Sequence, residues 1–171
     1  MLMRIVLTYT VVVNLLLVDQ AVKAASVSML KDRTPYEVVP GLFNLAYVEN
    51  RGCAWGMFQG HVWPLAVFAI LALVFLAWKR RSIFPPGRIG LISEVLLYAG
   101  IIGNLLDRVV RGFVVDMFDF HWGVHHFPVF NVADSYITVA AGILILVGLL
   151  QSDGKKRNPS GVKNVGDGGA S

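Results

Sequence analysis

The sequence predicts an all-α integral membrane protein with four transmembrane helices and a small β-rich element outside the membrane. Hydrophobic residues make up 56% of the 171-residue chain and charged residues only 15%, whereas soluble domains are about a quarter charged. The apolar residues are gathered into four long runs, which a soluble core does not require. The length suffices for one domain, which we place at residues 1–151.

The first span is expected at residues 4–25. We expect it to remain in the protein and not to be cleaved as a signal peptide. Asp19, Gln20 and Lys23 stand where the small-residue cleavage site of a signal peptide would begin. A helix that continues past them to Ala25 has about 20 residues, which is long enough to cross a bilayer.

The rest of the chain divides by composition. Prolines and glycines punctuate residues 26–60, and short alternating apolar segments between them predict strands. The remaining spans are predicted at residues 62–78, 89–106 and 133–150. Residues 107–133 form a polar and aromatic stretch, and the Gly-, Ser- and Lys-rich tail at 152–171 is expected to be disordered and cytoplasmic.

Basic residues predict the orientation of these spans. Nine Lys and Arg residues fall on the side of both termini and the 79–88 loop, against six on the side of the 26–60 and 107–133 stretches. The positive-inside rule therefore places both termini in the cytoplasm. Topology explains the basic residues and the formal charge of +4, so we expect no nucleic-acid partner.

Four carboxylates are then expected at one depth, near the outer ends of the spans. Ionisable groups at membrane depth are expensive, so each is a candidate functional residue. They are Asp19, Asp107, Asp116 and Asp134. Simpler structural roles also exist, because Asp134 can cap the fourth helix and Asp107 can pair with Arg108 or Arg111.

Paired carboxylates have a specific chemistry. Two that lie close together do not both ionise cheaply, so near neutral pH one keeps its proton. The ionised member can activate water, and the protonated member can assist the carbonyl and the leaving amine. This is the chemistry of an aspartic peptidase, and the residues alone leave Asp107 as eligible as the others.

Other chemistries are less well supported, and we expect neither a metal nor a cofactor. His121, His125 and His126 lack the helical H-E-x-x-H arrangement of a zinc site. Ser135 is next to Asp134 but has no nucleophile elbow around it. Cys53 is the one cysteine of the chain, and such a residue is more often a packing residue.

The segments around the acids resemble the lipoprotein signal peptidase (signal peptidase II) family. They follow the order of the family and cover residues 19–134. The matching segments are Asp19-Gln20 with Lys23, Asn50-Arg51-Gly52-Cys53-Ala54-Trp55-Gly56, Gly103-Asn104-Leu105-Leu106-Asp107-Arg108, Gly112-Phe113-Val114-Val115-Asp116 and Phe130-Asn131-Val132-Ala133-Asp134. Cys53 and Trp55 depart from the family, which usually has Ala and Phe there.

The resemblance implies an inner-membrane endopeptidase with a periplasmic β-sheet cradle and an active site near the periplasmic side. It would remove the signal peptide from diacylglyceryl prolipoproteins, before the lipidated cysteine, with Asp116 and Asp134 as the catalytic pair. The implied partners are these substrates and membrane lipids, and we expect a monomer. Supporting or substrate-binding residues would be Asp19, Lys23, Asn50, Gly52, Asn104, Asp107, Arg108 and Asn131.

Two rival functions come from other classes. A small ion-coupled transporter would use Asp19, Asp107 and Asp134 as a relay, but it predicts acids spread across the membrane and an internal repeat. A non-catalytic lipoprotein chaperone would need the sheet but not the aspartate pair. Substitution of the acids by Asn should leave the function of a chaperone intact, whereas a transporter is disfavoured because the acids gather on one side and the sequence shows no repeat.

Overall fold

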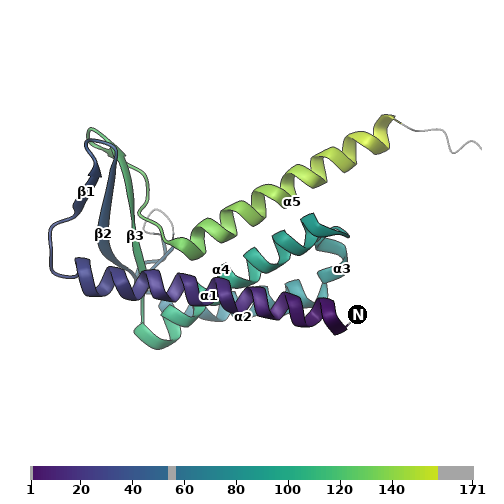
Figure 1. The fold of residues 1–171 in the computed structure, drawn as a ribbon, viewed down its shortest axis with the longest axis horizontal. Helices are drawn as coiled ribbons and strands as arrows, with labels where there is room; N and C mark the ends of the chain where they lie inside the picture. The colour runs from purple at the N-terminus through teal and green to yellow at the C-terminus, as the bar shows by residue number, and fades with distance from the viewer. Residues whose placement is uncertain (1, 54–56, 158–171) are drawn as a thin grey trace, which may run out of the picture.

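A computed structural model describes residues 2–53 and 57–157 of the chain as a group of helices with a small sheet at one end (Figure 1). The helices are α1 (Leu2–Leu30), α2 (Val62–Trp78), α3 (Arg80–Ile83), α4 (Arg88–Arg111) and α5 (Val132–Arg157). The strands are β1 (Tyr36–Val39), β2 (Phe43–Asn50), β3 (Val114–Trp122) and β4 (His125–His126).

Apolar helices make this a membrane protein. Within the described residues, three helices are long and apolar enough to cross a bilayer, with 25, 24 and 20 residues in the apolar parts of α1, α4 and α5. The shorter α2 has 17 residues and is apolar throughout. The prediction of a membrane protein with a small sheet is therefore confirmed, with three to four apolar helices.

Three helices are longer than the predicted spans, and α1 runs to Leu30 instead of residue 25. α4 runs to Arg111 instead of residue 106, so Asp107 and Arg108 belong to the helix and not to the following stretch. Gly112 ends it in the left-handed conformation, at φ 76°, and its N–H bonds the Arg108 carbonyl at 3.2 Å. The predicted span ended at residue 106 because hydropathy falls at the charged residues Asp107 and Arg108. The helix itself continues, because its backbone hydrogen bonds do not depend on apolar side chains.

The predicted tail begins inside a helix. α5 extends to Arg157, past the expected end of the fourth span at residue 150. Residues 152–157 of the expected disordered tail are thus helical, because a helix requires continuous backbone bonding rather than apolar side chains. Residues 158–171 lie outside the described residues, so the disorder of the tail stays a prediction there.

The sheet is antiparallel, in the order β1-β2-β3-β4. Its first two strands come from residues 26–60, as predicted, but β3 and β4 come from the 107–133 stretch, where no strand was expected. The register of β2 on β3 sets Val48 opposite Asp116 and Asn50 opposite Val114. In Figure 1 the sheet occupies one end of the molecule, while α1 begins and α5 finishes toward the other end.

Close packing joins α1 to α4 and to the start of α5. Val12, Val95 and Ala99 form a buried cluster that joins α1 to α4. A methyl group on Gly103 of α4 would lie 2.7 Å from an Asp19 oxygen and 3.2 Å from Ala133 Cβ. The absence of a side chain at Gly103 therefore lets α1 and the start of α5 meet beside α4, whereas the far part of α5 diverges from α4 (Figure 1).

Candidate active site

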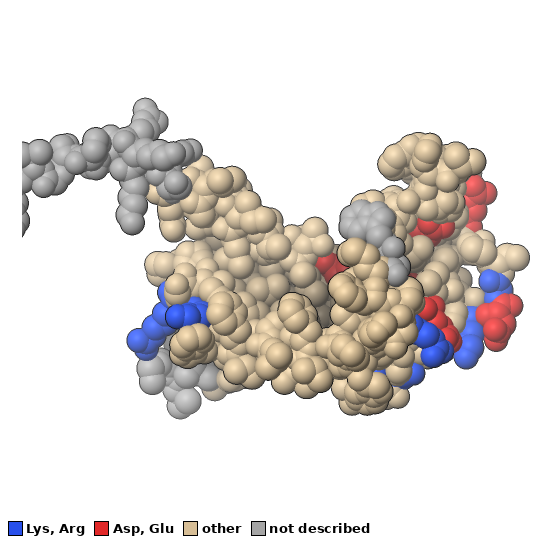
Figure 2. All heavy atoms as spheres, turned by 180° about the vertical axis from the view of Figure 1, so that it is seen from behind, with Lys and Arg blue, Asp and Glu red and all other residues tan. Residues whose placement is uncertain are grey.

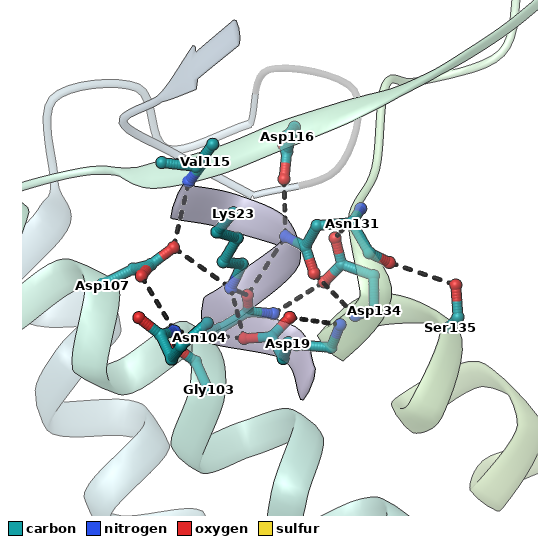
Figure 3. A network of polar contacts seen from close by, with 12 residues as sticks. Asp19, Lys23, Gly103, Asn104, Asp107, Val115, Asp116, Asn131, Asp134 and Ser135 are labelled. Carbon is teal, nitrogen blue, oxygen red and sulfur yellow. Dashed lines mark hydrogen bonds and ion pairs between the residues drawn. The ribbon is translucent and has the colours of Figure 1, made fainter. Parts of the chain in front are cut away.

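Asp116 and Asp134 come together around one asparagine, Asn131. Asp116 lies on β3, and Asp134 lies in the first turn of α5, three residues after Asn131. The Asn131 side-chain amide donates to Asp116 Oδ1 at 2.6 Å, and the Asn131 backbone N–H donates to Asp134 Oδ2 at 3.2 Å (Figure 3). In return, Asn131 Oδ1 accepts the backbone N–H of Asp134 at 2.9 Å. Asp134 therefore does cap its helix, in a reciprocal capping box, while its carboxylate also faces the site.

Two further amides fix the same carboxylates. Asn104 of α4 donates to Asp134 Oδ1 at 2.7 Å, and Asn50 at the end of β2 donates to Asp116 Oδ2 at 2.9 Å. Each of the four carboxylate oxygens thus accepts one N–H bond. Across residues 2–53 and 57–157, no ion pair includes Asp116 or Asp134. Among the described residues, only neutral donors orient the pair, and no cation bonds it directly.

This environment favours the protonated form of Asp116. The side chain is buried, with 1% of the residue exposed. Burial, and then the charge of Asp134, raise the pKa of Asp116 from 3.8 to about 7, against the opposing effect of the Asn50 and Asn131 hydrogen bonds. Asp116 is therefore placed to carry a proton near neutral pH.

The other two acids form a separate cluster around Lys23. Lys23 lies 3.0 Å from Asp19 and 3.1 Å from Asp107, and all three side chains are fully buried. Arg111 pairs with Asp107 one helical turn away and also donates to Gln20 at 3.0 Å. Two acids and two bases balance, which makes such a buried group tolerable. We call Asp19, Lys23, Asp107 and Arg111 the ion cluster.

The ion cluster supports the backbone beside each member of the pair. Asp19 accepts the N–H of Ala133 at 2.9 Å, immediately before Asp134. Asp107 accepts the N–H of Val115 at 3.1 Å, immediately before Asp116. Asp19 and Asp107 are thus placed to position the pair. Lys23 completes the link, because its ammonium donates to Asn104 Oδ1 at 3.2 Å and so orients the amide that binds Asp134.

Of the two partners that the sequence allowed for Asp107, the structure selects Arg111 and not Arg108. Arg108 donates to the carbonyls of Asn104, at 3.3 Å, and Gly52, at 3.1 Å. Adjacent residues of a helix point in different directions, whereas residues four apart share a face, so Arg111 pairs with Asp107 instead. Arg108 therefore joins α4 to the loop that follows β2.

Two cavities flank the carboxylate pair. The larger, of about 540 Å³, is mostly apolar and is lined by Asp134 and α5 residues such as Ile137. The smaller, of about 340 Å³, is lined by Asp116 and by polar residues including Glu49 and Gln59. The residues common to both linings are Asn50, Cys53, Phe127, Pro128 and Val129. Figure 2 shows acidic atoms at the base of the hollow between α5 and the sheet.

The structure brings together the residues singled out from the sequence. Gly52 also belongs to the site, since its N–H donates to Asn50 Oδ1 at 2.9 Å.

Gln20 and Arg111 were not predicted as site residues, although the i, i+4 spacing of Asp107 and Arg111 indicated that these two side chains could pair. In the described ranges, no group of three His, Cys, Asp or Glu side chains is arranged to hold a metal ion. Trp55 lies outside the described residues.

Comparisons with known proteins agree on one family. The family model described as signal peptidase (SPase) II matches residues 11–150. The chain is 44% identical over 132 residues to the lipoprotein signal peptidase of Syntrophotalea carbinolica, covering 75% of this chain and 82% of the relative. It is 36% identical over 142 residues to that of Clostridium acetobutylicum, covering 82% and 92%. A solved bacterial membrane enzyme superposes with a TM-score of 0.75 at 31% identity, covering 93% of this chain and 94% of that one.

Proposed function

We propose that this chain, which belongs to the signal peptidase II family, is an aspartic endopeptidase that cleaves diacylglyceryl prolipoproteins before the lipidated cysteine. Asp116 and Asp134 are its catalytic pair, and the reaction needs no metal. Its relatives carry the name lipoprotein signal peptidase, which supports the substrate class.

The bridging of Asp116 and Asp134 by Asn131 carries this proposal. Of the four candidate acids Asp19, Asp107, Asp116 and Asp134, the first two are neutralised by Lys23 and Arg111. General acid–base chemistry requires carboxylates that can gain and lose a proton, and a buried ion pair opposes both changes. Only the pair held by amides meets that requirement, so Asp107 is no longer as eligible as Asp116.

The proposed reaction uses one proton shared by the pair. The ionised aspartate takes a proton from water, and the resulting hydroxide adds to the scissile carbonyl while the protonated aspartate donates to the carbonyl oxygen. The tetrahedral intermediate then collapses. Its C–N bond breaks, the amine of the lipidated cysteine takes up a proton, and the signal peptide leaves with a new carboxylate. The amides of Asn50, Asn104 and Asn131 hold both carboxylates in place during these steps.

The substrate is proposed to lie partly in the membrane. The larger cavity is lined by apolar residues of α5, a helix long and apolar enough to span the bilayer, so acyl chains can remain in lipid while the peptide reaches Asp134. The bilayer then supplies part of the binding and orientation. The excess of Lys and Arg at the opposite end supports a cytoplasmic location for both termini and a periplasmic active site.

Cleavage of a purified diacylglyceryl prolipoprotein in detergent tests this proposal. Asp116→Asn and Asp134→Asn are expected to abolish turnover, and a chelator should change nothing. Asp119→Asn is the matched control, because Asp119 lies on the same strand as Asp116 but bonds Asn44 and His126. If Asp116→Asn cleaves normally while Asp107→Asn is inactive, the catalytic pair is wrong. Binding of prolipoprotein without any cleavage by the wild type would favour a chaperone.

A further inference from the structure

A third cavity, of about 310 Å³, lies far from the carboxylate pair, at the end of the molecule opposite the sheet. It opens between α1, α2 and α4, and its walls include the apolar residues Val12, Ala77 and Ile102. The proposed peptidase reaction uses none of these residues. The cavity also contains two charged groups, Arg80 and Glu94, which an apolar packing defect does not require.

Arg80 and Glu94 form an ion pair at the edge of this cavity. Arg80 donates to Glu94 through Nη2 at 2.9 Å and through Nε, which leaves Nη1 outside the pair. The Glu94 side chain is 4% exposed, whereas that of Arg80 is 39% exposed. Glu94 lies six residues into α4, a depth of about 9 Å along the helix axis. The pair therefore fixes an exposed guanidinium where the apolar span meets the polar surface.

The surroundings of Arg80 are strongly basic. Lys79, Arg81 and Arg88 are close to it in sequence, so this turn has four positive charges against the single negative charge of Glu94. Figure 2 shows Lys and Arg atoms at this end of the molecule without acidic atoms on the same face. Lys79 also lies 4.1 Å above the ring of the exposed Trp78. Tryptophan and lysine at the end of a span mark the headgroup layer of a bilayer.

We propose that this cavity binds one anionic phospholipid. Its phosphate would lie beside Arg80 and the basic turn, and one acyl chain would lie against Val12, Ala77 and Ile102. Basic pockets between membrane helices suit such headgroups, since each Lys or Arg near an anionic lipid surface contributes about 1 kcal/mol, or about a fivefold change in affinity. The apolar walls distinguish this site from a surface that attracts anions by charge alone.

Native mass spectrometry of the full chain in detergent tests this site through lipid binding, independently of peptidase activity. The chain is titrated with dioleoyl phosphatidylglycerol or with dioleoyl phosphatidylcholine, which has the same acyl chains but no net charge. We expect one tightly bound phosphatidylglycerol and weaker binding of phosphatidylcholine. Lys79→Gln with Arg81→Gln keeps the Arg80–Glu94 pair intact and should weaken phosphatidylglycerol binding about 25-fold. Lys31→Gln with Arg33→Gln removes two charges at the sheet end and should have no effect.

A second variant tests the contribution of the cavity separately from that of the basic residues. Ala77→Phe places a ring where the acyl chain is proposed to lie and keeps every basic residue, so it should also prevent binding. Val74→Phe is the control, because Val74 is exposed on the same helix and does not line the cavity. Unchanged binding by Ala77→Phe, equal losses in the Lys31/Arg33 control, or equally tight binding of soluble glycerol phosphate would each overturn the proposal.

Discussion

Asp116→Asn is predicted to change the pH dependence of stability as well as activity. The rise in pKa of Asp116 from 3.8 to about 7 corresponds to about 4 kcal/mol. The folded protein binds this proton more tightly than the unfolded chain does. Wild-type stability from this group is therefore complete below pH about 4 and is lost as the pH rises to about 7. An asparagine does not titrate, so the variant lacks this loss.

The size of the effect depends on what the new amide meets. Both oxygens of Asp116 accept N–H bonds, from the side-chain amides of Asn131 and Asn50. An asparagine at this position has one oxygen and one NH₂ group, so its NH₂ must face the NH₂ of Asn131 or Asn50. That mismatch costs about 1–3 kcal/mol at every pH. Asp116→Asn should therefore be less stable than wild type at pH 4, where little of the wild-type stabilisation has been lost, and more stable at pH 8.

Thermal unfolding in detergent measures this difference. For a protein of this size, 1 kcal/mol moves Tm by about 2–4 °C. The Tm of Asp116→Asn relative to wild type should accordingly be higher at pH 8 than at pH 4 by about 7–15 °C. Glu37→Gln, at an exposed residue of β1, controls for removal of a carboxylate in general. A Tm difference that is the same at both pH values would refute the reasoning.

Three further predictions concern individual residues. Asn131→Ala removes a hydrogen bond to the Asp116 carboxylate, worth about 1.5–3 kcal/mol, so the rate constant of cleavage in a single-turnover assay should fall about 10- to 100-fold; weaker substrate binding with an unchanged rate constant would contradict this. Lys23→Met leaves Asp19 and Asp107 buried without their shared cation and should destabilise the protein by about 3–5 kcal/mol in thermal unfolding, whereas Lys31→Met at the surface should not. Alkylation of Cys53, which lines both cavities beside the pair, should block cleavage in the wild type but not in Cys53→Ala.

Hydropathy was sufficient to predict the apolar helices but not where they end. α4 continues through Asp107 and Arg111 because these residues bury their charges in the ion cluster, which a hydropathy pattern does not reveal. β3 was missed for a related reason. Its first part, from Val114 to Asp119, is buried almost continuously, so the residues there do not alternate between polar and apolar as those of a half-exposed strand do.

The residues that form the site could be predicted from the sequence, but residue types and spacing did not predict which two carboxylates act together. Residue types and spacing placed four acids at one level but left open which of them share a proton, and only the family resemblance implied Asp116 and Asp134. That choice depends on contacts far apart in the chain, such as Lys23 with Asp107 and Asn131 with Asp116. Close packing at Gly103 brings Asp19 beside Ala133, and sequence spacing does not encode that approach.

The central claim is that Asp116 and Asp134 act as one catalytic unit, and the turnover of a double variant tests it most directly. Single-turnover cleavage of a diacylglyceryl prolipoprotein is compared for Asp116→Asn, Asp134→Asn and the two combined. If the carboxylates share one proton, either substitution removes the function of both, and the double variant should be no slower than the slower single variant. If the two losses instead multiply, Asp116 and Asp134 act independently and the shared-proton mechanism is wrong.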